Sequence, residues 1–167
     1  KALGLPVYRL LGGKMRDEIE LYIGISNLDS AALAEMAAEH VALGYRAFKI
    51  EPMNQSRDTI VELARRTREA LGPEPMLSVD VGYLWNDVGI ALSVLPRLEE
   101  FDIFFFETPF PVDTMEPYAR LTAQTPLRIA AGEHAVTRWE FLDFMDRGGM
   151  LVMQPYMTTC GGLTEAR

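Results

Sequence analysis

The sequence has one cysteine, few basic residues and no long apolar run. The single cysteine among its 167 residues, Cys160, excludes an intramolecular disulfide and fits a reducing compartment such as the cytoplasm. No apolar run approaches the roughly 20 residues that cross a bilayer, so we expect no transmembrane helix and no membrane partner. The formal net charge of −8 argues against nucleic acid as a partner, because no basic face offsets phosphate repulsion.

What is present is the composition of a folded domain. Hydrophobic residues make up 49% of the chain and charged residues 24%, which excludes disorder and allows one sizeable core. Between short apolar runs the chain has amphipathic spacing, which predicts a helix after each of the first five runs. The runs themselves are the expected strands, at residues 20–26, 46–51, 76–80, 103–107, 127–133 and 150–154.

Capping residues and proline set the expected limits of the helices. Ser30 is the expected N-cap of the first helix. Pro96 is expected to kink or shorten the third, which covers about residues 86–98. The fifth helix begins with a capping-box pattern, in which Thr137 is followed three residues later by Glu140.

The succession of six strand-and-helix units predicts a parallel sheet with helical crossovers. Two architectures have this order, an open doubly wound sheet and a (β/α)8 barrel. The units recur about every 26 residues between Ser26 and Tyr156, and this regularity favours the barrel. A complete barrel takes ~250 residues, so about six units predict an incomplete one. Its first and sixth strands should be edges whose apolar faces are exposed or covered by another chain.

Acidic residues end four consecutive expected strands. They are Glu51, Asp80, Glu107 and Glu133, spaced 29, 27 and 26 residues apart. Strand alternation turns Asp80 and Glu107 toward the barrel interior, at the rim where barrel enzymes carry their active sites. Converging carboxylates repel one another unless a cation lies among them, and oxygen ligands alone suit Mg²⁺ before Mn²⁺. The alternative is that these acids are solvated or pair with arginines, but three in register on adjacent strands favour a metal site.

Lysine is scarce, yet one lysine lies within an apolar strand. In the run FKIE (residues 48–51) the alternation turns the two apolar side chains toward the helices, and Lys49 and Glu51 inward. Beside a metal cation Lys49 would lose its proton more readily and act as a base; the alternative is a structural ion pair with Glu51 or Asp80. His134 either contacts substrate at the rim or is a loop histidine without a catalytic task.

Several segments of the chain resemble one known family in order. They are KALGLPVYRLLGG (1–13), YRAFKIEP (45–52), SVDVGYLW (78–85), FFETPFP (105–111), AAGEH (130–134) and QPYMTTCGGLTEA (154–166). Together they resemble the mandelate racemase/muconate lactonizing branch of the enolase superfamily. The resemblance implies a modified (β/α)7β barrel preceded by an α+β capping domain. Residues 1–19 would link that domain to the barrel, and residues 20–167 would be the first six barrel units, without the cap.

The resemblance also implies roles for particular residues. Lys49 matches the first lysine of the family's Lys-x-Lys motif, whereas Glu51 stands where the second lysine, often the base, would be. Tyr156 stands where many relatives have an aspartate that orients a histidine. The three Mg²⁺ ligands of the family match the acids Asp80, Glu107 and Glu133.

Members of this family bind a carboxylate substrate on the metal and remove its α-proton, giving a metal-stabilised enediolate. We therefore expect a Mg²⁺-dependent enzyme acting on a small carboxylic acid, with an acid-sugar dehydratase as the leading interpretation. Lys49, Glu51 and Tyr156 are the candidate acid–base groups, and His134 is a candidate substrate contact. A racemase, epimerase or cycloisomerase, and a metal-binding relative without turnover, are the alternatives. We expect a homo-oligomer in the full-length form.

Overall fold

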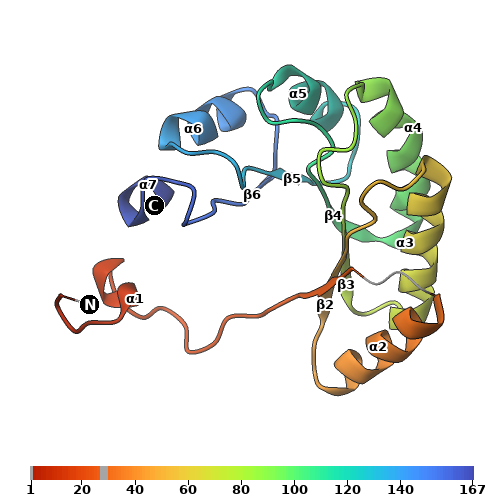
Figure 1. Cartoon of the computed structure of the whole chain (residues 1–167), viewed down its shortest axis with the longest axis horizontal. Helices are drawn as coiled ribbons and strands as arrows, with labels where there is room; N and C mark the ends of the chain where they lie inside the picture. The colour runs from red at the N-terminus through yellow and green to blue at the C-terminus, as the bar shows by residue number, and fades with distance from the viewer. Residues whose placement is uncertain (1, 27–29) are drawn as a thin grey trace.

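The computed structural model describes residues 2–26 and 30–167, and in this part of the chain the strands form one parallel sheet. Its order is β1-β2-β3-β4-β5-β6. The sheet curves into an arc whose two edges, β1 and β6, do not pair, so the expected incomplete barrel of six units is confirmed (Figure 1). The strands are β1 (Ile23–Ile25), β2 (Ala47–Ile50), β3 (Met76–Asp80), β4 (Ile103–Glu107), β5 (Ile129–Ala131) and β6 (Val152–Met153).

The strands at the centre of the sheet match the sequence prediction most closely. Both β3 and β4 begin and end at the predicted residues. By contrast, β6 has two residues where five were predicted. It pairs only with β5, so no second neighbour extends it.

Helices cover the convex side of the arc. From α2 to α6 each helix leads from one strand to the next, whereas α1 and α7 lie at the opening of the arc (Figure 1). None of the helices in the described residues combines the length and apolar character needed to cross a membrane. They are α1 (Val7–Leu10), α2 (Ser30–Ala42), α3 (Arg57–Leu71), α4 (Val88–Leu98), α5 (Glu116–Thr122), α6 (Arg138–Asp146) and α7 (Leu163–Ala166), with a 3-10 turn η1 (Glu99–Phe101) after α4.

The ends of these helices test the capping predictions. The capping box before α6 is confirmed: Thr137 Oγ1 accepts a hydrogen bond from the backbone of Glu140, whose side chain accepts one from the Thr137 backbone. The predicted cap by the Ser30 side chain lies outside the described part of the structure. Of the two effects predicted for Pro96, a kink or a shortening, the shortening does not occur, because α4 continues past the proline to Leu98. The predicted kink stays a prediction.

The two faces of the sheet differ in chemistry, as strand alternation predicts. The convex face packs against the helices to form the hydrophobic core, whose fully buried side chains include Phe48, Ile50, Leu77 and Phe106 from the strands and Ile60, Leu95, Leu98 and Leu121 from the helices. The concave face carries buried polar side chains instead. These are Lys49, Ser78, Asp80 and Glu107.

Large apolar side chains are exposed near both edges of the arc. Most of them lie in residues 3–22 and 136–157, next to β1 and β6. The helix α1 approaches α7 across the opening, where Leu11 and Leu163 line one pocket (Figure 1). Exposed apolar surface beside the edge strands is therefore present, as predicted.

Candidate active site

Three charged side chains meet at the carboxyl ends of β2, β3 and β4. Asp80 and Glu107 are register partners on neighbouring strands, so their carboxylates lie side by side. Lys49 lies one strand away, and its Nζ donates to Asp80 Oδ2 at 3.0 Å and to Glu107 Oε2 at 2.9 Å. All three residues are buried, so their charges interact with little screening by solvent.

Burial and charge act in opposite directions in this cluster. Burial alone would lower the pKa of Lys49, but hydrogen bonds to Glu107 and Asp80 raise it above its ordinary value. For Glu107, burial and the neighbouring Asp80 charge raise the pKa, while the hydrogen bond from Lys49 opposes them. One ammonium thus faces two carboxylates. A third carboxylate, Glu51, lies 3.7 Å from Lys49 Nζ and is partly exposed.

Asp80 is also held from its other side. Its Oδ1 accepts hydrogen bonds from the Thr108 hydroxyl at 2.7 Å and from the Gly82 backbone N–H at 3.0 Å. Since Oδ2 accepts from Lys49, both oxygens of this carboxylate have fixed partners. Such bonds fix the orientation of the carboxylate.

Glu133, which follows β5, has a different environment. Its Oε1 accepts a hydrogen bond from the Tyr83 hydroxyl at 2.7 Å, and His134 Nε2 lies 3.7 Å from the same oxygen. Burial and the neighbouring Glu133 charge raise the pKa of Tyr83, so the phenol keeps its proton and donates. Glu133 is partly exposed, unlike Asp80 and Glu107.

Of the three predicted metal ligands, Asp80 and Glu107 therefore lie side by side, and Glu133 is separate from them. Among residues 2–26 and 30–167, no group of three His, Cys, Asp or Glu side chains has the spacing to hold a metal ion. The donor set nevertheless suits a hard cation, because it consists of carboxylate oxygens and a cation, Lys49 Nζ, already lies between two of them. Beside Glu107, Gln154 has a buried Oε1 without a hydrogen-bond partner among the described residues. The metal role of these residues stays a prediction.

Comparison with known proteins shows the family of the chain. Residues 32–167 match the model of a family described as enolase C-terminal domain-like. The chain belongs to that family. The resemblance to the mandelate racemase/muconate lactonizing branch of the enolase superfamily is thus confirmed.

Individual members of the enolase superfamily match the chain along almost its whole length. It is 34% identical to a D-galactonate dehydratase of Xanthomonas oryzae pv. oryzae, over 99% of this chain and 45% of that protein. It superposes on the 3,6-anhydro-D-galactonate cycloisomerase of Zobellia galactanivorans with a TM-score of 0.90 at 29% identity, over 99% of this chain and 46% of that one. It superposes on a racemase of Streptomyces coelicolor A3(2), solved with bound magnesium, with a TM-score of 0.88 at 28% identity. This match covers 97% of this chain and 48% of the racemase. The chain spans less than half the length of these relatives.

Two other predicted site residues lie away from the cluster of Lys49, Asp80 and Glu107. Tyr156 is in the turn after β6, its side chain is exposed, and its carbonyl oxygen accepts from Thr159 N. His134 is exposed and its ring lies 5.2 Å from that of Tyr83. The structure therefore brings Lys49 and Glu51 to the paired carboxylates, but not Tyr156.

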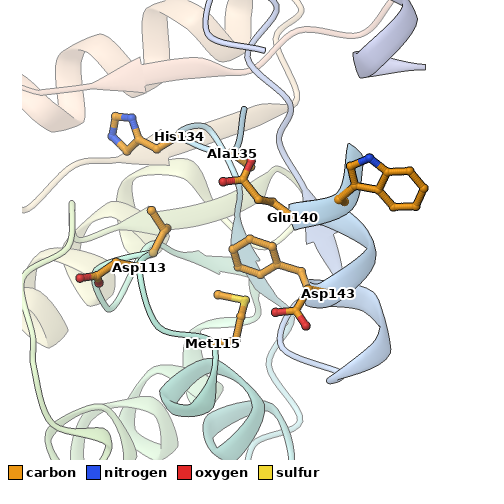
Figure 2. A pocket seen from close by; sticks show the side chains of 9 residues that line it. Asp113, Met115, His134, Ala135, Glu140 and Asp143 are labelled. Atoms are coloured by element: carbon orange, nitrogen blue, oxygen red, sulfur yellow. The ribbon is translucent and has the colours of Figure 1, made fainter. Parts of the chain in front are cut away.

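His134 also borders a cavity of about 380 Å³ on the outer side of the strand ends (Figure 2). Asp113 and Met115 line it from the segment before α5, and Glu140 and Asp143 line it from α6. Two of these acids have partners already, since Glu140 belongs to the capping box and Asp143 pairs with Arg147. The paired carboxylates of the candidate site do not line this cavity.

Sequence reasoning missed two hydroxyl donors at the site. Thr108 donates to Asp80, and Tyr83 donates to Glu133. A signal was available, because Thr108 directly follows the strand-ending Glu107 and Tyr83 follows the strand-ending Asp80 by three residues. Side chains just beyond a strand end lie at the same rim as the acids.

Proposed function

We propose that the chain carries the metal-binding and proton-transfer residues of an enolase-superfamily enzyme that removes the α-proton of a small carboxylic acid. The leading reaction is dehydration of an acid sugar. The observation that carries the proposal is the position of Lys49 Nζ between Asp80 and Glu107 at the strand ends. The proposed base and two of the proposed ligands thus lie within hydrogen-bond distance of one another.

The proposed ligands of Mg²⁺, with Mn²⁺ as a substitute, are Asp80, Glu107 and Glu133. Their carboxylate oxygens and the unpartnered Gln154 Oε1 beside Glu107 support a hard cation here. A divalent cation, when bound, stabilises negative charge that develops on a substrate carboxylate as its α-proton leaves. Binding among the same oxygens requires Lys49 to give up at least one of its carboxylate contacts. That release frees Lys49 Nζ for proton transfer.

Lys49 is the proposed base because it is the buried amine at this rim. Elimination of water also requires a group that protonates the departing hydroxide. Glu51 is the nearer candidate, with Oε1 3.7 Å from Lys49 Nζ, and Tyr156 is the more distant one. His134, exposed at the same rim, is proposed as a substrate contact.

The relatives support an acid-sugar substrate and also a second candidate reaction. One is named D-galactonate dehydratase, and another 3,6-anhydro-D-galactonate cycloisomerase, so both act on sugar acids by name. The superposition on the cycloisomerase favours an isomerase as the second candidate. A metal-binding relative without turnover is the third, because Glu51 and Tyr156 replace residues that the family uses in catalysis.

The proposal extends to the organisation of the whole protein. Residues 1–19 are proposed as the segment that joins a capping domain to the barrel, and residues 20–167 as six barrel units. In support, the first strand begins only at Ile23, and the preceding segment extends away from the sheet (Figure 1). A homo-oligomer is also proposed, since apolar side chains are exposed beside both edges.

Turnover in D₂O distinguishes these reactions. The protein with Mg²⁺ is incubated with a panel of acid sugars and followed by proton NMR. Formation of a 2-oxo acid with loss of water supports the dehydratase, and deuterium at the α-carbon without loss of water supports the isomerase. Neither product nor exchange at any α-carbon would indicate a relative without turnover.

A variant tests the role of Lys49 in particular. Lys49→Ala should abolish α-proton exchange while Mg²⁺ affinity, measured by calorimetry, is retained. The matched control is Lys14→Ala, which removes an exposed lysine that pairs only with Asp17. Exchange that continues unchanged in Lys49→Ala would assign the base to another residue.

A further inference from the structure

Tyr83 has no role in the proposed reaction, yet its conformation is unusual. Its φ is +61°, in the left-handed region that bulky side chains rarely adopt. Its hydroxyl donates to Glu133 Oε1 at 2.7 Å and so joins the loop after β3 to the end of β5, two strands away. A strained residue persists only where its surroundings impose the conformation.

The backbone around Tyr83 supplies that constraint. Beyond the end of β3, the chain continues to pair with the segment that follows β4. The N–H groups of three alternate residues donate to successive carbonyl oxygens of that segment: Val81 to Glu107 O at 3.2 Å, Tyr83 to Thr108 O at 2.7 Å and Trp85 to Pro109 O at 3.0 Å. Thr108 N in turn donates to Ala130 O of β5 at 2.9 Å. The Tyr83 ring is thereby fixed across the end of β4, with its hydroxyl at Glu133.

Its partner Thr108 repeats the same pattern. Thr108 is also a non-glycine residue at positive φ, +46°, and its hydroxyl donates to Asp80 Oδ1 at 2.7 Å. Two adjacent residues in the left-handed region, hydrogen-bonded to each other, therefore each direct a hydroxyl at a proposed metal ligand. The repeated pattern indicates that the left-handed backbone conformations direct the two hydroxyls toward the carboxylates.

We propose that Tyr83 is the positioning residue of Glu133. Its hydroxyl holds Oε1 and leaves Oε2, which has no hydrogen bond among the described residues, to serve as the ligand atom. The inference rests on the proposed function, because it requires Glu133 to be a ligand. Hydrogen bonds of this kind orient ligating carboxylates, and their loss typically costs ~10–100-fold in metal affinity.

The test is a titration of the protein with Mn²⁺, in which electron paramagnetic resonance measures the free ion. Tyr83→Phe keeps the ring and removes only the hydroxyl, and it should raise the Kd for Mn²⁺ by roughly tenfold or more. The matched control is Tyr118→Phe, which removes a hydroxyl bonded to the Phe110 carbonyl instead of to a carboxylate. Its Kd should equal that of the wild type, although both variants lose one hydrogen bond.

A double mutant separates positioning from a general effect on folding. Glu133→Asp keeps a carboxylate but withdraws it from the Tyr83 hydroxyl, so adding Tyr83→Phe to it should raise the Kd no further. An equal increase in both backgrounds would overturn the inference, as would a Kd for Tyr83→Phe within about twofold of the wild type. Wild-type protein that binds no Mn²⁺ would overturn the proposed function and this inference with it, whereas binding that Tyr83→Phe leaves unchanged would overturn the inference alone.

Discussion

The centre and the edges of the arc differ in how completely apolar side chains are buried and charged side chains are hydrogen-bonded. Around β2, β3 and β4, apolar side chains are buried against α3 and α4, and the buried charges have hydrogen-bond partners. Beside β1 and β6, large apolar side chains are exposed and the strands are two or three residues long. A parallel strand is normally buried between neighbours on both sides and helices on its outer face, and the edge strands β1 and β6 lack the second neighbour.

The same difference separates the candidate site residues. Lys49, Asp80 and Glu107 belong to the centre, and their positions follow from strand register and burial. Glu133 and Tyr156 lie toward the β6 edge and are partly or largely exposed. The central cluster is therefore rigidly placed, whereas the positions of the edge residues depend on loop contacts such as the Tyr83 hydroxyl.

The largest expected effect compares a buried with an exposed phenylalanine on β4. Phe106 is fully buried and stacks on Trp85, whereas Phe104 is 38% exposed beneath Arg128. Phe106→Ala should lower the free energy of unfolding by about 3–5 kcal/mol, because it leaves a cavity in the core. Phe104→Ala should cost about 1 kcal/mol or less. Denaturant unfolding measures both, and equal losses would contradict the contrast between a buried and an exposed side chain on this strand.

The next effect concerns the buried charges of the centre. Without metal, Lys49→Ala leaves Asp80 and Glu107 facing each other with no counter-charge between them. The free energy of unfolding should fall by about 3–5 kcal/mol, and added Mg²⁺ should restore part of this loss. Thermal unfolding with and without Mg²⁺ measures the difference. A variant as stable as the wild type in the absence of metal would show that the cluster is not held by the ammonium.

Much of the centre could be predicted from sequence, because local rules and tertiary contacts agree there. Alternation along residues 46–51 placed Lys49 on the concave face, and the strand-ending acids Asp80 and Glu107 became register partners. The two-residue length of β6 could not be predicted, since an apolar run does not show how many neighbours it has. The hydrogen bond from Tyr83 to Glu133 could not be predicted either. It joins residues 50 positions apart in the sequence, and it accompanies left-handed backbone conformations at Tyr83 and Thr108.

Two helix caps of similar chemistry, one in the centre and one nearer the edge, should contribute less to the free energy of unfolding than the buried side chains do. Ser56 caps the central helix α3 by accepting from Thr59 N, and Thr137 caps α6, nearer the edge, within a capping box. Each substitution by alanine should cost about 1 kcal/mol in global unfolding. If α6 opens independently of the centre, however, Thr137→Ala should speed amide hydrogen exchange in α6 alone. Slower exchange in α6 than in α3 in the wild type would contradict the expectation that α6, nearer the edge, opens more readily than α3 in the centre.

The smallest expected effect is the titration of two partly exposed glutamates, one in the centre and one at the edge. Hydrogen bonds from Arg65 and Arg66 lower the pKa of Glu62 on α3 to about 2, and those from Arg138 lower the pKa of Glu165 on α7 to about 2. Because the pKa is lowered, each contact stabilises the fold fully at pH values above 4.5, the ordinary pKa of the carboxyl group. This stabilisation is lost as the pH falls through about 2.

Carbon-13 NMR of the carboxyl groups measures both titrations. Arg138→Gln should return the pKa of Glu165 toward 4.5 and leave that of Glu62 unchanged. The Glu62 pairs lie within one helix, whereas the Arg138–Glu165 pair joins α6 to α7 across the edge of the arc. In the wild type both carboxyl groups should titrate near 2. A pKa of Glu165 closer to 4.5 than that of Glu62 would contradict a stable contact between α6 and α7, because this ion pair forms only while the two helices stay in contact.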